Sequence, residues 1–232
     1  MALPETRCHA TVAGLDAGGQ PGERKRVPKR RHTFAIAGGG LLLAARTGLT
    51  AQSGIGQVTR RSGEAAAIRG SAIVALAPGD PVFVDDVLRT GPESRLLVSC
   101  GDGLQITIGP TTELALRRFV SDQPGGALEV VLGLLHGIAR LLGSAIPAGR
   151  TIEVDTRTAV ASVRSTQWLL ESTDKGTGVL SIEGAVTVLA LAGGQVVLQP
   201  GQGTDVPPGG PPKAPALWGE ARRRDAIART TI

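Results

Sequence analysis

The sequence predicts an all-β fold, an antiparallel sandwich or jelly-roll-like barrel of about a dozen short strands that ends in a short helix after a Pro/Gly linker. Apolar and polar residues alternate in short bursts between Ala77 and Leu116, and turn sequences such as Gly101-Asp102-Gly103 separate the bursts. The same alternation of apolar bursts and turn sequences continues to Leu198. Short strands bounded by Gly, Pro and Asp indicate an antiparallel fold.

Strand candidates follow one another from Gly63 onwards. Two short apolar pieces surround Gly70, and the segment from Ala77 to Leu116 supplies several more. Later candidates keep the spacing of roughly 8–12 residues that is typical of sandwiches and barrels. These later candidates are Thr151–Val154, Val160–Val163, Gln167–Ser172, Gly178–Ile182, Ala185–Leu189 and Val196–Leu198.

The segment Leu128–Leu142 is compatible with two structures. Its leucines could share one face of a helix, although Gly133 and Gly137 would interrupt that helix. Because the neighbouring segments favour strands, we predict two strands joined by a turn here and keep the helix as the alternative.

Four parts are expected along the chain: a basic leader and signal segment at 1–51, a β-domain at 58–205, a Pro/Gly-rich linker at 206–215 and a helical tail at 216–232. Proline lacks the backbone N–H that a regular hydrogen-bond ladder requires, so the linker interrupts the β-domain. The tail contains Trp218 and three consecutive arginines and is typical of a short amphipathic helix. We expect this helix to be frayed or docked on the β-domain rather than bound to a membrane.

The basicity of the chain is confined to its leader. The whole chain carries a net charge of +5, and residues 1–51 hold eight Lys or Arg against three acids, so the remainder is neutral. A neutral body without basic stripes and stacking aromatics does not favour nucleic-acid binding. Aromatic residues make up only 2% of the chain, and Val, Leu, Ile and Ala must therefore fill the core.

The leader has the organisation of an export signal. A basic run at 24–31 precedes the apolar segment Phe34–Ala45, which at 12 residues is shorter than the roughly 20 that a membrane-spanning helix needs. The pair Arg30-Arg31 and the Gly-containing apolar segment resemble a twin-arginine signal. We therefore predict export to the periplasm or beyond through a signal around Arg30–Ala51, with transient membrane contact through the leader. The alternatives are an uncleaved anchor and a basic cytosolic tail.

Several segments, taken in their order, resemble the periplasmic domain of the FecR family. Asp85–Gly91 matches the end of the pattern G-D-x-V-x-x-G-D-x-L-x-T-G, and Gly101–Pro110 matches D-G-S-x-L-x-L-x-P. Val163–Trp168 follows V-R-G-T-x-F, with Ser165 for Gly and Trp168 for Phe. The resemblance covers about Gly63–Val206.

The resemblance implies an extracytoplasmic β-domain that senses or binds and has no known catalytic residues. In the best-known members a cytoplasmic segment regulates a sigma factor, and a transmembrane helix joins it to the periplasmic domain. The residues before Phe34 show no amphipathic helical period. A free-standing exported protein with a FecR domain therefore fits this sequence better than a sigma-factor regulator.

Five residues have side chains that could serve a site, and the sequence offers a structural explanation for each. His136 lies in a leucine-rich stretch, and Cys100 has no activating base beside it. Asp85 and Asp86 could bind Ca²⁺ or act with Asp102, but consecutive strand residues point to opposite faces, so we interpret them as solvated turn acids. We thus predict no catalytic, cofactor-binding or metal-binding residues and no cofactor.

One further residue, Arg164, is expected to order the core beside Trp168 by pairing with an acid such as Asp102 or Glu183 rather than to bind a ligand.

The predicted function is a non-enzymatic extracytoplasmic binding or signalling module. Its partner would be an envelope protein or a glycan, recognised through sheet edges and loops. The alternative is a membrane-anchored FecR-type regulator of an extracytoplasmic-function sigma factor. A carbohydrate-processing β-domain is a third and weaker hypothesis.

Overall fold

The computed structural model describes residues 54–120, 129–143, 151–163 and 167–232. These residues form 17 β-strands, one 3₁₀ turn at Gly101–Gly103 and one α-helix. The predicted all-β fold with a short C-terminal helix is confirmed. The expected strands from Thr151 to Leu198 all form, while the final two strands, β16 and β17, were not predicted. The leader lies outside the described residues.

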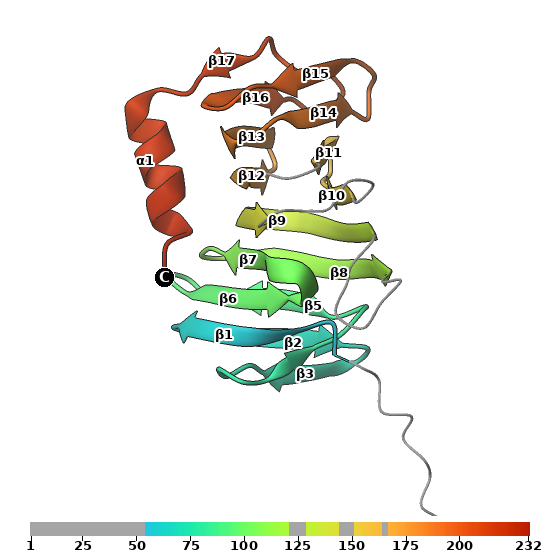
Figure 1. The fold of residues 1–232 in the computed structure, drawn as a ribbon, viewed down its shortest axis with the longest axis vertical. Helices are drawn as coiled ribbons and strands as arrows, with labels where there is room; N and C mark the ends of the chain where they lie inside the picture. Colours follow the sequence, from blue (N-terminus) through green and yellow to red (C-terminus); the bar gives the residue numbers. More distant parts are fainter. Residues whose placement is uncertain (1–53, 121–128, 144–150, 164–166) are drawn as a thin grey trace, which may run out of the picture. The chain divides into compact units, whose positions relative to one another are not determined.

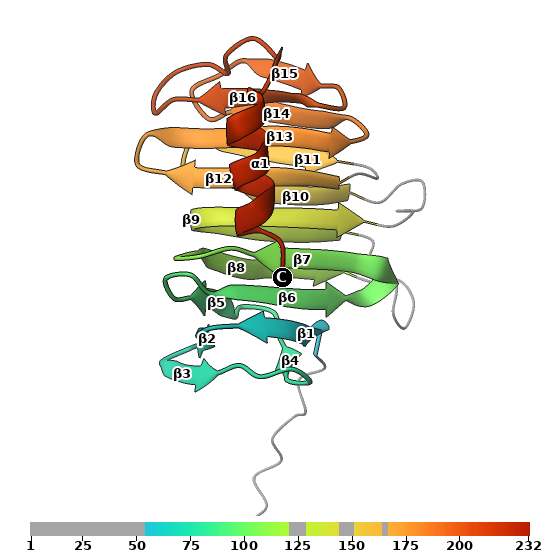
Figure 2. The same ribbon diagram turned by 90° about the vertical axis from the view of Figure 1, so that its left-hand side faces the viewer.

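The strands build two layers that pack face to face (Figures 1 and 2). The first layer, sheet A, has the order β4–β1–β6–β7–β9–β12–β13–β16–β17, and its neighbouring strands are antiparallel. Its strands are β1 (Gly56–Ser62), β4 (Pro81–Val82), β6 (Arg95–Cys100), β7 (Leu104–Ile108), β9 (Glu129–Gly143), β12 (Gln167–Thr173), β13 (Gly176–Glu183), β16 (Gln202–Val206) and β17 (Ala216–Leu217).

The second layer, sheet B, has the order β3–β2–β5–β8–β9–β10–β11–β14–β15. Only its pairing of β9 with β10 is parallel among the described strands. The strands not yet given are β2 (Ala65–Arg69), β3 (Ala72–Ala75), β5 (Val87–Thr90), β8 (Glu113–Val120), β10 (Thr151–Asp155), β11 (Ala159–Val163), β14 (Val186–Ala190) and β15 (Gln195–Leu198).

One strand, β9, belongs to both layers. Its first half pairs with β8 in sheet B, and its second half pairs with β7 and β12 in sheet A. The passage occurs at Gly137, whose φ of 93° lies outside the range that other residues adopt freely. The prediction of two strands joined by a turn was therefore wrong, as was the alternative helix: the segment is one continuous strand that bends from one sheet into the other.

The hydrophobic core lies between the two layers. Alternation along each strand sends every second side chain inward, where apolar burial stabilises the sandwich by about 25 cal/mol per Å². Trp168 on β12 is the largest side chain in this core and is fully buried. The same core cluster contains aliphatic residues of both layers, including Val98, Ile106, Leu141 and Val179 from sheet A and Leu88, Leu114, Leu132, Val154 and Val188 from sheet B.

The helix α1 (Glu220–Arg229) lies across the outer face of sheet A (Figure 2). Trp218 and Ala226 pack there against Ile138, Leu169 and Leu180, which form a second, smaller apolar cluster. The end of the chain is tied down as well, because Arg60 donates a hydrogen bond to the carbonyl of Ile232 at 2.8 Å. Within the described residues, no helix has the length and apolar character needed to cross a membrane.

The bend at Gly137 gives a direct test of the fold. A Cβ at this position would lie 2.2 Å from Oγ1 and 2.6 Å from Cα of Thr112, whereas Gly79, with φ of 97°, has nothing within 4 Å. We expect Gly137→Ala to lower the free energy of unfolding by about 3 kcal/mol and the matched control Gly79→Ala by about 1 kcal/mol. Urea unfolding followed by circular dichroism measures both. Equal losses would contradict the proposed crowding at the bend.

Candidate functional site

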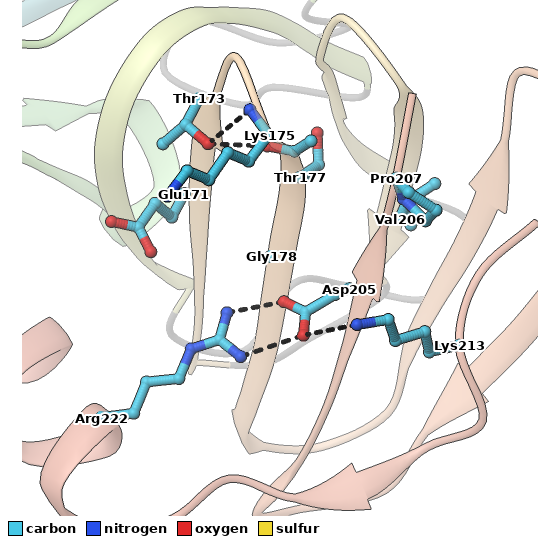
Figure 3. A pocket seen from close by; sticks show the side chains of 11 residues that line it. Glu171, Thr173, Lys175, Thr177, Gly178, Asp205, Val206, Pro207, Lys213 and Arg222 are labelled. Carbon is cyan, nitrogen blue, oxygen red and sulfur yellow. Dashed lines mark hydrogen bonds and ion pairs between the residues drawn. The ribbon is translucent and has the colours of Figure 1, made fainter. Parts of the chain in front are cut away.

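A polar depression of ≈ 370 Å³ lies where the β12–β13 hairpin, β16 and the first turn of α1 meet (Figure 3). Arg222 donates two hydrogen bonds to the carboxylate of Asp205, at 2.6 and 3.1 Å, and Lys213 lies 4.0 Å from the same carboxylate. The guanidinium of Arg222 also stacks on the Trp218 ring, 3.5 Å from its centroid. The main charged side chains of the depression, Arg222, Asp205 and Lys213, are thus engaged with one another.

Two glycines make this arrangement possible. A Cβ on Gly203 would lie 2.2 Å from Nε1 of Trp218, and a Cβ on Gly178 would lie 2.7 Å from the guanidinium of Arg222. Because these two glycines have no side chains, the indole of Trp218 and the guanidinium of Arg222 can lie close to the backbone of sheet A. At the other end of α1, Arg229 pairs with Glu171 at 2.8 Å. We interpret these contacts as the attachment of α1 to sheet A. The depression beside them is therefore not interpreted as a reaction centre.

A second depression, of ≈ 410 Å³, opens at the end of sheet B beside the edge strand β3. Its floor is made of small residues, Ala65, Ala66 and Ala75, and Arg61 and Arg89 stand at its rim. Arg61 donates a hydrogen bond to the carbonyl of Leu76 at 2.7 Å, just after β3. The alanines make part of the hollow apolar, and Arg61, Arg89 and Glu64 add charges of both signs to its lining.

The outer face of sheet B carries charges in its middle. Arg117 lies over Gly133 and pairs with Asp155, while Arg118 pairs with Glu129. Glu153 stands between these acids and forms no ion pair with another described residue. Partial burial, together with the charges of Asp155 and Glu129, raises the pKa of Glu153 above its usual value. This cluster disfavours a third negative charge.

The candidate acids of the β4–β5 turn have different environments. Asp85 is exposed and adopts φ of 69°, as a turn acid does. Asp86 was expected to be solvated and is instead fully buried: Arg69 donates two hydrogen bonds of 2.8 Å to its carboxylate. The guanidinium of Arg69 also lies 4.2 Å from the centroid of the Phe83 ring. Asp86 is therefore a structural residue that closes one end of the sandwich.

The other weighed residues do not converge on a site. His136 is exposed on β9, on the strand that carries the bend. Cys100 is a buried free cysteine, and desolvation raises the pKa of its thiol to about 12, so the reactive thiolate is suppressed. Arg164 and the side chain of Asp102 lie outside the described residues. Among the residues that are described, no His, Cys, Asp and Glu side chains gather in a group of three that could hold a metal ion.

Sequence reasoning missed the Arg69–Asp86 pair and the Arg222–Trp218 stack. Each joins residues that become neighbours only through strand register or helix docking. The one available signal was the position of Trp218 four residues before Arg222, which is a helix-like spacing.

Comparison with known proteins finds one family that resembles part of this domain. Residues 86–187 match the family described as FecR protein, and the resemblance seen in the sequence is thus confirmed. The FecR family is regulatory and is associated with the periplasm and the membrane. The matched segment begins at β5 and ends in β14, and it includes the bend of β9.

Solved structures with a similar fold exist as well. Two crystal structures of a candidate anti-sigma factor from Parabacteroides distasonis ATCC 8503 align with TM-scores of 0.51 and 0.50 at 16% and 15% sequence identity. The alignments cover 61% of this chain and 63% and 64% of those chains, which is less than two thirds of their length. At this identity the likeness concerns the fold. No curated protein matches the chain.

The buried Arg69–Asp86 pair predicts that two similar Arg→Leu substitutions lower the free energy of unfolding by different amounts. Arg69→Leu leaves the fully buried Asp86 carboxylate without its partner, and we expect a loss of about 3 kcal/mol in the free energy of unfolding. Arg89→Leu removes an exposed partner of Glu113 and should cost less than about 1 kcal/mol. Chemical denaturation of both variants at neutral pH compares them. A small loss for Arg69→Leu would mean that water reaches Asp86.

The acidic cluster predicts a pH-dependent gain in stability. Because the pKa of Glu153 is raised in the folded state, its ionisation costs stability as the pH rises through that pKa, and the cost is absent below the unfolded value. Glu153→Gln should therefore stabilise the protein at pH 7 by about 0.5 kcal/mol and should have no such effect near pH 3.5. Thermal unfolding at both pH values tests this expectation, and an equal gain at both would contradict it.

Proposed function

We propose that this chain is a non-enzymatic extracytoplasmic binding or signalling module that recognises a protein or another cell-envelope ligand through sheet B. The FecR family is one of signalling and regulatory proteins, which supports this class of function. We further propose that the leader directs export, through the twin-arginine-like signal around Arg30–Ala51. The ligand would then meet the domain in the periplasm or outside the cell.

The observation that carries the proposal is the unequal covering of the two sheets. Leu189 and Val197 lie diagonally across the β14–β15 ladder on one face of sheet B, and neighbouring exposed apolar residues mark surfaces that other molecules cover. The helix α1 covers the part of the outer face of sheet A formed by Ile138, Leu169 and Leu180, whereas most exposed large apolar residues belong to sheet B and its loops. Among the described residues this set comprises Ile73, Val74, Val120, Leu135, Leu189, Leu191 and Val197, and only Leu217 of the exposed large apolar residues belongs to sheet A.

The ion pair between Arg222 of α1 and Asp205 of sheet A supports the same assignment. Arg222 and Asp205, which dominate the depression of Figure 3, form an ion pair, and Arg222 also stacks on Trp218. A ligand in that depression would have to displace these contacts. A ligand on the exposed apolar residues of sheet B would not have to displace these contacts.

Paired surface variants test which sheet binds. The full-length protein would be cross-linked in envelope extracts of its source organism, as wild type, as Val197→Lys and as Leu217→Lys. Both residues are exposed, at 45% and 76%, and lie on β15 of sheet B and β17 of sheet A. We expect the yield of the specific adduct to fall at least about tenfold for Val197→Lys, since a buried unpaired charge costs several kcal/mol, and to stay unchanged for Leu217→Lys. The reverse pattern, or adducts insensitive to both changes, would refute recognition through sheet B.

A second candidate function is membrane-anchored regulation of an extracytoplasmic-function sigma factor. The likeness of the fold to candidate anti-sigma factors favours it. Here the leader would stay attached as an anchor. Mass spectrometry of the N-terminus after cell fractionation separates the two functions: an intact leader in the membrane fraction, with loss of one sigma-factor regulon on deletion of the gene, would replace free export by anchored regulation.

A further inference from the structure

The edge strand β3 presents an unprotected pairing surface. Within the described residues it pairs only with β2, and all four of its residues, Ala72–Ala75, are exposed. Ile73 is 70% exposed, the most of any large apolar residue but Leu217. Edge strands are commonly protected from pairing by lysine, proline or a bulge, and β3 contains none of these.

The register of the β2–β3 hairpin determines which amide groups face outwards. The N–H of Leu76 donates to the carbonyl of Ala65 at 2.9 Å, so Leu76 and Ala65 form a hydrogen-bonded pair. Hydrogen-bonded and non-hydrogen-bonded pairs alternate in an antiparallel ladder, and Val74 and Ala72 therefore also bond to β2. The N–H and C=O groups of Ile73 and Ala75 consequently point away from β2, towards the open edge.

We propose that β3 pairs with β3 of a second copy of this chain, so that sheet B continues across a two-fold axis. The outward amides permit an antiparallel register in which Ile73 of each copy bonds with Ala75 of the other. Val74 then lies opposite Val74 of the second copy, on the two-fold axis, as a non-hydrogen-bonded pair. This self-association goes beyond the proposed recognition of an envelope ligand and does not depend on it.

Side-chain shapes on the outer face of sheet B match this register. Ala75 and Ala66 line the hollow of ≈ 410 Å³ beside β3, and both are opposite each other in the ladder. In the two-fold arrangement the cross-strand neighbour of Ala75 is Ile73 of the second copy. The exposed side chain of Ile73 of one copy thus enters the alanine-lined hollow of the other, and the same contact forms twice.

Charge favours a second copy over a charged partner strand. The strand β3 itself is uncharged, so the pairing brings no like charges into opposition. One end of the strand lies near Arg61, Glu64 and Arg89 in the hollow, where Arg89 is paired with Glu113, and the other follows the buried Arg69–Asp86 pair. Each end therefore carries cations and anions in equal number, and antiparallel pairing places two neutral ends together.

Disulfide trapping tests the register in the full-length protein. Cys8 is first replaced by serine; Cys100 remains, because burial and a thiol pKa of about 12 keep it unreactive. In this background, Val74→Cys places two thiols on residues with Cα atoms about 4.5 Å apart, within disulfide range. The matched control Ile73→Cys is the more exposed but places its thiols about 7–8 Å apart on a diagonal. We expect covalent dimers of Val74→Cys to form at least ten times faster under mild oxidation.

Sedimentation equilibrium supplies the second measurement. A four-residue edge contact is smaller than a standard interface of about 800 Å² per partner, so the association is expected to be weak and concentration-dependent. The average mass of the wild type should rise from the monomer value of 23.7 kDa towards twice that value, while Val74→Lys should remain at 23.7 kDa with an unchanged circular-dichroism spectrum. A mass of 23.7 kDa for the wild type at all concentrations, or equal trapping rates for Val74→Cys and Ile73→Cys, would overturn the proposal.

Discussion

The bend of β9 at Gly137 is the constraint on which the two-layer structure depends. Because one strand serves both sheets, the inner faces of the layers must meet at a fixed distance and register on either side of the bend. Thr112 holds the position: its Oγ1 accepts a hydrogen bond from the N–H of Ile138 at 3.0 Å and donates to the carbonyl of Pro110 at 2.9 Å. The bend therefore has its own hydrogen bonds and leaves little room for a side chain.

The bend also divides the molecule into two surfaces of different character. After Gly137 the chain continues in sheet A, where Ile138 contributes its side chain to the cluster under α1. Before Gly137 it runs in sheet B, where Leu135 remains exposed. The helix makes few apolar contacts of its own, with Ala226 as its buried residue, and is held largely by Trp218 and by arginine ion pairs. Part of the outer face of sheet A is thus covered by the chain itself, whereas no described helix covers the outer face of sheet B.

Local patterns were sufficient for most strands but not for contacts between them. Alternation and turn residues predicted β10 to β15, because each strand buries one side and each turn needs Gly, Asn or Asp. The continuous β9 was missed because a glycine that bends a strand and a glycine that ends one have the same local signal. The prediction of a solvated Asp86 was wrong because its partner Arg69 lies 17 residues earlier and reaches it only through the pairing of β2 with β5. Its burial follows from register, which no short segment specifies.

Because short segments do not specify strand register, the sequence indicated a binding function without indicating which surface of the domain binds. Asp86, a candidate site residue in the sequence, contributes to the fold through its ion pair with Arg69, and Asp205 likewise pairs with Arg222. What distinguishes the open side of the molecule is a set of aliphatic side chains, which in the sequence are indistinguishable from core residues. Ile73 and Leu88 are both apolar strand residues, yet one is 70% exposed and the other is fully buried. Only the stacking of the two layers separates them, because a residue faces the core or the solvent according to which side of its sheet the other layer covers.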